Sequence, residues 1–164
     1  MVNKDQGPAL TPKLNSVSGF TLIEILVVIG LIAVLAGVVL VAVNPSRQFA
    51  QGRDSQRNSN LNALLNAIGQ KIADSKGVFA TGCPVLPGPA LADAKVVDSA
   101  GGGGGIDLSC LVPTYIPALP TDPSGVAAPS TGYKVYQDGN GRVHVLAETQ
   151  EPSIPRTAAI EIVR

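Results

Sequence analysis

Residues 16–43 read SVSGFTLIEILVVIGLIAVLAGVVLVAV, and this stretch decides the fold of the first part of the chain. From Phe20 to Val43 the only charged residue is Glu24. Roughly 20 predominantly apolar residues are enough for a helix to cross the hydrocarbon core of a bilayer. A carboxylate inside such a helix costs about 2.5 kcal/mol or more to insert. We therefore expect Glu24 to have a partner or a function.

Two simpler interpretations of this stretch fit less well. A secretory signal has an apolar core of about 7–15 residues, followed by small residues at the cleavage site. Here the apolar run is longer, and the small and polar residues 16–19 come before it. A plain membrane anchor explains the length of the run, but it leaves Glu24 and the Gly19-Phe20 junction as coincidences.

The segment GFTLIE, residues 19–24, resembles the prepilin signal of type IV pilins and of the pseudopilins of type II secretion. The resemblance covers about residues 19–45. It implies that a membrane-embedded prepilin peptidase cleaves after Gly19 and that the new N-terminus, Phe20, is methylated. It also implies that the apolar helix is kept in the mature protein.

The same resemblance implies an assembly function for Glu24, in which its carboxylate engages the N-terminal amine of a neighbouring subunit. After cleavage, the amine of Phe20 lies about one helical turn from Glu24. Attraction between the two charges grows as the local dielectric falls. A second interpretation is that Glu24 only caps its own helix, at the positive end of the helix dipole. Both functions can hold together.

The charge of the chain is balanced, with 12 basic and 12 acidic residues. A neutral chain offers no electrostatic attraction to nucleic acid, so no nucleic-acid partner is predicted. The distribution of arginine and lysine does not favour the cytoplasmic N-terminus that a prepilin requires. Lys4 and Lys13 precede the apolar run, whereas Arg47, Arg53 and Arg57 follow it. The cleavage motif and the cysteines outweigh this signal.

A second helical pattern follows the apolar run. Apolar residues recur along one stripe of a helix at Leu61, Leu64, Leu65, Ile68 and Ile72. A helix continuous from about residue 20 to 75 would be roughly 84 Å long. Pro45 lacks a backbone donor and clashes with the preceding turn, so we expect a kink or local melting near residues 42–46. Alternatively, Ser46 is the N-cap of a new helix.

Cys83 and Cys110 are the only cysteines, and they flank a segment rich in proline and glycine. A disulfide between them would contribute about 3–4 kcal/mol in an oxidising compartment. Metal binding is the weaker alternative, because the cysteines lack close ligand spacing and the chain has one histidine. The glycine run 101–105 predicts a flexible surface loop, since no Lys-Ser or Lys-Thr pair follows it to bind phosphate.

Residues 115–125, YIPALPTDPSG, also resemble a loop that precedes the strands of pilin-like proteins, above all of major pseudopilins. Those relatives often carry an aromatic residue after the Asp-Pro pair, and calcium binds near the loop in some. Here Ser124 stands in that position, and the downstream acidic ligands are not recognisable. We favour a rigid path fixed by the prolines, with calcium near Asp122 as the alternative. No metal or other cofactor is predicted.

The C-terminal part carries strand patterns. The turn residues DGNG at 138–141 separate the alternating segments 133–137 and 142–147, which predicts a β-hairpin. Residues 160–163 can add a third strand, about the minimum for a stable sheet on a helix. His144 falls on the face opposite the apolar residues of its strand. A lone histidine there is more often a packing residue than a catalyst, and no motif ties a serine or cysteine to it.

These patterns predict an α+β, pilin-like fold with one long N-terminal helix packed, in its second half, on a small C-terminal antiparallel sheet. Residues 1–19 are the expected leader peptide, and residues 20–45 are the transmembrane and filament-core part of the helix. Residues 46–76 are its amphipathic second half, and residues 77–164 form the globular head with the αβ-loop and the sheet.

The expected function is structural and not enzymatic. We expect a pilin that spans the inner membrane once as a precursor, with its head outside, and then enters a surface filament. Its expected partners are further pilin copies, the prepilin peptidase and the inner-membrane assembly platform. One alternative is a pseudopilin of a type II secretion or DNA-uptake machine, which the loop around Asp122 favours somewhat. Another is a membrane-tethered extracytoplasmic binding protein or enzyme that does not polymerise.

Overall fold

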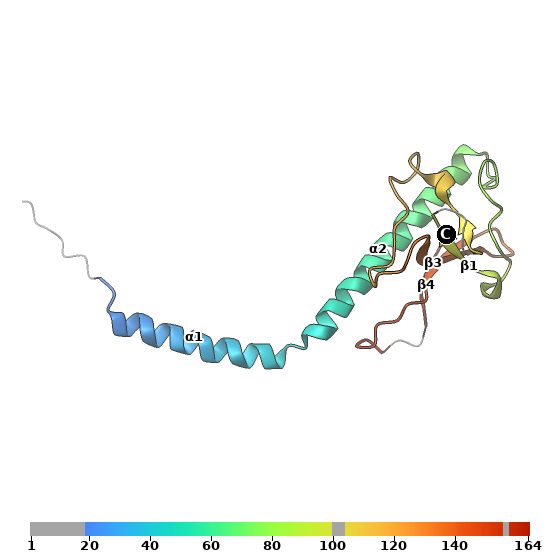
Figure 1. Cartoon of the computed structure of the whole chain (residues 1–164). Coiled ribbons are helices and arrows are strands. Elements are labelled where there is room, and N and C mark those ends of the chain that lie inside the picture. Colours follow the sequence, from blue (N-terminus) through green and yellow to red (C-terminus); the bar gives the residue numbers. More distant parts are fainter. Residues whose placement is uncertain (1–18, 100–103, 156–157) are drawn as a thin grey trace, which may run out of the picture. The chain divides into compact units, whose positions relative to one another are not determined.

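The computed structural model describes residues 19–99, 104–155 and 158–164 (Figure 1). The expected leader peptide lies outside the described residues apart from Gly19, and so does most of the glycine run 101–105. The described chain divides into two compact units, one ending at Val43 and the other beginning at Asn44. Each unit is described separately below.

The first unit is helix α1 (Leu22–Ala42), which has 21 residues. Its side chains are apolar on every side, and none of its residues is buried. At 1.5 Å per residue the helix is about 32 Å long, close to the thickness of a bilayer core. Within the described residues it is the one helix that is long and apolar enough to cross a membrane.

Helix α2 (Pro45–Asp74) is a separate helix and not a continuation of α1. Asn44 is its N-cap, and the side-chain oxygen of Asn44 accepts a hydrogen bond from the backbone N–H of Arg47 at 3.3 Å. Pro45 occupies the first helical position, where a missing N–H costs nothing and the fixed φ suits a helix. The helix is thus interrupted within the expected segment, but the suggestion of Ser46 as N-cap is wrong. The hydroxyl of Ser46 donates to Asn44 Oδ1 at 2.7 Å.

The second unit contains a five-stranded sheet in the order β2-β1-β3-β4-β5. Strands β1 and β2 pair in parallel, and the other neighbours are antiparallel. The strands are β1 (Lys95–Asp98), β2 (Ile106–Asp107), β3 (Ser130–Gln137), β4 (Val143–Ala147) and β5 (Ile160–Val163), with short 3-10 helices η1 (Leu91–Asp93) and η2 (Ser109–Leu111).

The three strands expected from the sequence are present as β3, β4 and β5. Strand β3 begins three residues earlier than expected, at Ser130. Strands β1 and β2 were not predicted, because they have only four and two residues and lie among prolines and glycines. The hairpin turn closes with the Asp138 N–H donating to the Arg142 carbonyl at 2.9 Å.

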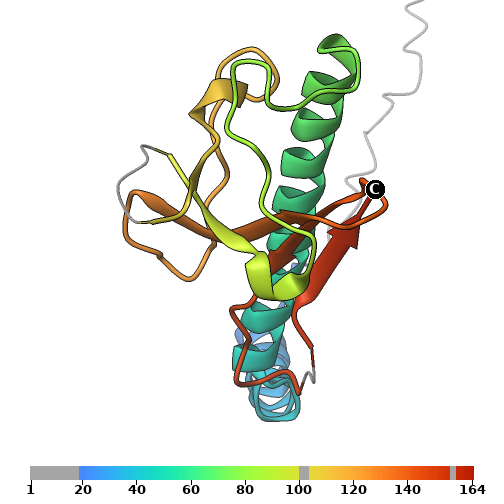
Figure 2. The same ribbon diagram turned by 90° about the vertical axis from the view of Figure 1, so that its right-hand side faces the viewer.

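The second unit, residues 44–164, is called the head from here on, and its core lies between α2 and the sheet (Figure 2). Four residues of the predicted stripe on α2 are buried, and Ile72 is partly buried beside them. They meet the inward-facing side chains Tyr133, Val135, Val143 and Val145 of β3 and β4. The buried hydroxyl of Tyr133 accepts a hydrogen bond from Asn60 Nδ2 at 2.8 Å, so its polar end is satisfied. The predicted α+β, pilin-like fold is confirmed.

Cys83 and Cys110 form the expected disulfide. Cys83 lies in the segment that follows α2, and Cys110 lies in η2. The loop that the bridge closes contains both β1 and β2. The disulfide therefore constrains one edge of the sheet as well as irregular chain.

Candidate functional site

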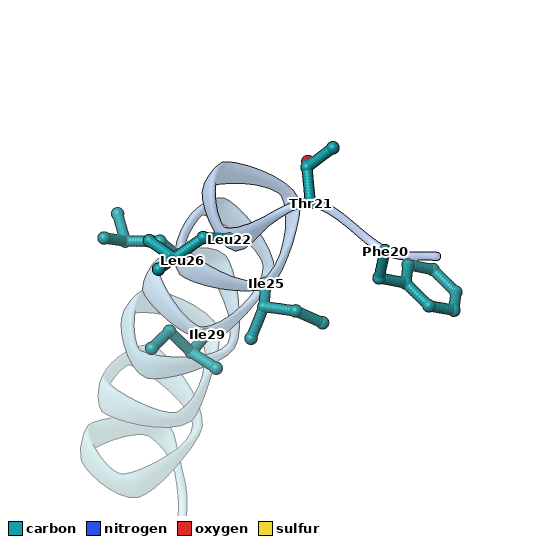
Figure 3. A pocket seen from close by; sticks show the side chains of 6 residues that line it. All are labelled: Phe20, Thr21, Leu22, Ile25, Leu26 and Ile29. Atoms are coloured by element: carbon teal, nitrogen blue, oxygen red, sulfur yellow. The ribbon is translucent and has the colours of Figure 1, made fainter. Parts of the chain in front are cut away.

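The start of α1 presents an apolar surface. Phe20 lies on the extended segment before the helix, and 80% of its surface is exposed. Figure 3 shows it beside the first turns of α1, whose side chains project away from the helix axis. The surface is lined by Phe20, Thr21, Leu22, Ile25, Leu26 and Ile29.

Glu24 is the single charged residue of α1 and belongs to its first turn. Its backbone N–H donates to Thr21 Oγ1 at 3.2 Å, which makes Thr21 the N-cap. Sequence reasoning missed Thr21, although the spacing Thr-x-x-Glu is that of a capping box. The Glu24 side chain is exposed, and no described residue forms an ion pair with it.

The start of α1 carries groups suited to association with lipid or with other protein chains. An exposed helix of this length that is apolar apart from Glu24 can be covered by lipid or by other apolar helices. Glu24 lies in the first turn, at the positive end of the helix dipole, and its exposed carboxylate is able to pair with a cation from another chain. Gly19 and Phe20 precede Thr21, the N-cap of the helix.

A second cluster of charged residues is buried in the head, where α2 meets two loops. The fully buried Arg57 donates from Nε and Nη2 to the two oxygens of Asp122, at 2.8 and 3.0 Å. Its Nη1 donates to Glu151 at 2.6 Å and to Asp54 at 3.0 Å. Ser124 Oγ accepts from Nη2 at 3.1 Å. One guanidinium thus ties two loops to the helix.

The charges of this cluster stabilise one another. Hydrogen bonds to Asp122 raise the pKa of Arg57 even though burial opposes the charge. Burial alone would raise the pKa of Asp122, but the bonds from Arg57 and Ser124 outweigh it and the net shift is downward. Arg53 forms an ion pair with Glu151, and this hydrogen bond is the largest cause that lowers the Glu151 pKa from 4.5 to about 2.

The alternative of a calcium site near Asp122 does not fit the structure, because the oxygens that would bind the ion are already hydrogen-bonded. Both carboxylate oxygens of Asp122 accept from Arg57, and Oδ1 also accepts from the backbone N–H and the hydroxyl of Ser124. The residues that the structure describes contain no group of three or more His, Cys, Asp or Glu side chains placed to hold a metal ion. Sequence reasoning named Asp122 but had no signal for Arg57 as its partner.

His144 lies on the face of the sheet away from α2, between two carboxylates. Its Nδ1 is 2.7 Å from Glu161 Oε1, and its Nε2 is 3.3 Å from Asp138 Oδ2. The ring stacks on Tyr136 at a centroid distance of 4.3 Å. Burial alone would raise the pKa of Asp138, but hydrogen bonds from Arg142 and others lower it well below its usual range. These contacts place His144 in a packed ionic cluster.

Comparison with known proteins identifies the type of N-terminal segment that this chain carries. The family model of the prokaryotic N-terminal methylation motif matches residues 14–40. This motif is the prepilin signal of type IV pilins and pseudopilins, so the chain carries a pilin-type N-terminus. The matched segment contains Gly19, Phe20 and Glu24. No curated protein and no solved structure matches the chain significantly.

Proposed function

We propose that this chain is a type IV pilin that is cleaved after Gly19, methylated at Phe20 and polymerised through α1 into a surface filament. The methylation motif supports a pilin-like or pseudopilin-like structural function and a membrane-anchored precursor. The observation that carries the proposal is α1 itself, an apolar helix of 21 residues without a buried residue and with one acid in its first turn.

The proposed assembly exchanges one apolar environment for another. Before assembly, α1 spans the inner membrane once and the head lies outside. In the filament, α1 is surrounded by α1 helices of other copies. Lipid tails are as apolar as these side chains, so burial of apolar surface alone gives little preference for the filament. The ion pair between Glu24 and a neighbour's Phe20 amine supplies the preference, because it strengthens where water is excluded.

The proposed subunit has four segments. Residues 1–19 are a leader removed by the prepilin peptidase, and residues 20–45 are the membrane and filament-core segment, which contains the break between α1 and α2. Residues 46–76 carry the amphipathic helix, and residues 77–164 complete the head. The inner-membrane assembly platform is the partner that receives the cleaved subunit.

Mass spectrometry of the N-terminal peptide from surface material tests the processing step. We expect a mature protein that begins at a methylated Phe20. A Gly19→Leu variant should remain uncleaved in the membrane fraction, because the bulky side chain occupies the cleavage position. Recovery of residues 1–19 on the surface protein would rule out the prepilin assignment.

Substitution of Glu24 tests the assembly step. Glu24→Ala removes the only charge of the span, so insertion and cleavage should proceed at least as well as in wild type. The neighbour's amine then lacks its partner, and breaking a buried ion pair typically costs about 3–5 kcal/mol. Filament yield relative to the membrane pool should therefore collapse, and Glu24→Gln should behave nearly as badly.

Thr21→Ala is the matched control for these variants. It removes the N-cap hydroxyl that accepts from the Glu24 N–H, yet it leaves the carboxylate in place. We expect a filament yield close to wild type. A normal filament yield from Glu24→Ala would show that the acid does not drive assembly. Equal losses of filament yield from Thr21→Ala and Glu24→Ala would show that Glu24 acts only in capping its helix.

A pseudopilin of a secretion or DNA-uptake machine is the second candidate, and the resemblance of residues 115–125 to a major pseudopilin loop favours it. Electron microscopy of sheared surface fibres, with identification of their protein, separates the candidates. Long fibres made of this chain support the pilin. Short fibres seen only on overproduction support the pseudopilin, and absence from every fibre supports a tethered protein that does not polymerise.

A further inference from the structure

Three carboxylates from three different segments bond one side chain, Arg57, inside the head. Asp54 comes from α2, Asp122 from the loop before β3, and Glu151 from the segment after β4. Each of the three is at least 95% buried. Carboxylate oxygens are the ligands that hard divalent cations such as Ca²⁺ prefer, yet no three acidic side chains among the described residues are placed to hold a metal ion. The cation at their centre is the guanidinium of Arg57.

We propose that Arg57 is a built-in cation that takes the place of a bound divalent metal, so that the head folds independently of calcium. An arginine is charged at every pH at which the protein is folded, and its planar fork matches a carboxylate in two-point contact. Arg57 makes this two-point contact with Asp122. Because it is attached to α2, its local concentration does not depend on the medium.

A calcium ion could enter this cluster only by displacing Arg57. The displaced guanidinium would lose its three carboxylate partners inside the head, and an unpaired buried charge is strongly destabilising. Arg53 adds a second positive charge on Glu151, which further repels an incoming cation. The loops around Asp122 and Glu151 are therefore fixed to α2 without an ion from outside. This inference concerns the head alone and does not depend on filament formation.

The first test uses the full-length wild-type chain in detergent micelles. Calcium binding is measured by titration calorimetry, and thermal unfolding is followed by the near-UV circular dichroism of the tyrosines. About 1 mM Ca²⁺ covers the range in which extracellular modules bind this ion. We expect no saturable binding and the same unfolding midpoint in calcium and in EGTA. Saturable binding that raises the midpoint would overturn the proposal.

The second test asks whether Arg57 is the residue that makes folding of the head independent of calcium. Arg57→Gln leaves the carboxylates without their cation, so its midpoint in EGTA should fall well below that of wild type. Added calcium should then recover part of the loss, because it binds only the variant's folded head. The matched control is Arg142→Gln, which removes an arginine paired with Asp138 on an exposed turn. Its midpoint should be insensitive to calcium. Identical behaviour of Arg57→Gln in calcium and in EGTA, whether folded or unfolded, would overturn the proposal.

Discussion

Helices α1 and α2 follow each other in the chain, but only one of them is covered by its own protein. None of the 21 residues of α1 is buried, whereas α2 buries eight of its 30 residues in the head. An apolar surface that surrounds a helix cannot be covered by one small domain, so α1 needs lipid or other chains. An apolar stripe can be covered by one sheet. The hydrophobic pattern therefore decides whether the partner of a helix lies outside or inside its own chain.

The charged residues of the two helices also differ in their surroundings. The acid in α1 is exposed, while two of the three arginines that follow the span are paired with carboxylates of the head. Arg57 is buried among carboxylates, and Arg53 is paired with Glu151. Arg47 remains exposed at the start of α2. The arginines that conflict with the usual charge rule for membrane orientation are thus, in two cases of three, structural parts of the folded head.

Truncation of one apolar side chain in each helix gives the largest expected difference. Leu64→Ala empties space in a fully buried position of the core and should cost about 4 kcal/mol of the free energy of unfolding. Leu35→Ala is the matched change in α1, where the residue is 66% exposed. Denaturant unfolding of the head should not detect it. Equal losses from both variants would contradict the distinction between the helices.

Removal of the disulfide should weaken the head and leave α1 unaffected. Closing this loop is worth about 3.5 kcal/mol in the chain-entropy model. A Cys83→Ser, Cys110→Ser double variant should lose about this much, and hydrogen exchange should increase most in β1 and β2. Wild-type protein should resist alkylation until it is reduced. Dithiothreitol should destabilise wild type but not the double variant; an equal effect on both would argue against the bridge.

Acid should loosen the attachment of the two loops to α2. The folded-state pKa of Glu151 is lowered from 4.5 to about 2, and that of Asp122 is also lowered. A lowered pKa contributes stability above the unfolded-state value, and this contribution disappears as pH falls through the folded-state value. The unfolding midpoint should therefore drop between about pH 5 and pH 2. In the Glu151→Gln variant the unfolding midpoint should drop less over this pH range. If its pH dependence were the same as that of wild type, Glu151 would not be a source of the acid sensitivity.

The smallest effect is expected at the helix caps. Asn44→Ala removes the side-chain oxygen that accepts from the Arg47 N–H, and loss of such a cap typically costs about 1 kcal/mol. The unfolding free energy of the head should fall by this amount, because α2 is part of the head. Thr21→Ala, the equivalent change at α1, should leave it unchanged. Asn44→Asp should restore the loss, since aspartate is an equally good cap.

The sequence by itself determined the features that depend on neighbouring residues. The apolar run predicted α1, and the prolyl break, the stripe on α2 and the DGNG turn each follow from periodicity or from residues with special backbone preferences. The two cysteines allow only one disulfide within the chain. The prepilin-like motif around Gly19 and Glu24 could be recognised for the same reason, because its signal lies within a few adjacent residues.

Only the tertiary structure decided which distant residues meet. Arg57 contacts Asp122 and Glu151 across separations of 65 and 94 residues, and no local pattern links them. From the sequence, Arg57 counted against the membrane orientation and Asp122 was a possible calcium ligand; in the fold they satisfy each other. Strands β1 and β2 are likewise too short to have a pattern of their own: β1 forms by pairing with the edge of β3, and β2 by pairing with β1. Preferences for helix, strand and turn depend on residues that are close in the sequence. Burial and charge pairing depend on residues that meet only when the chain has folded.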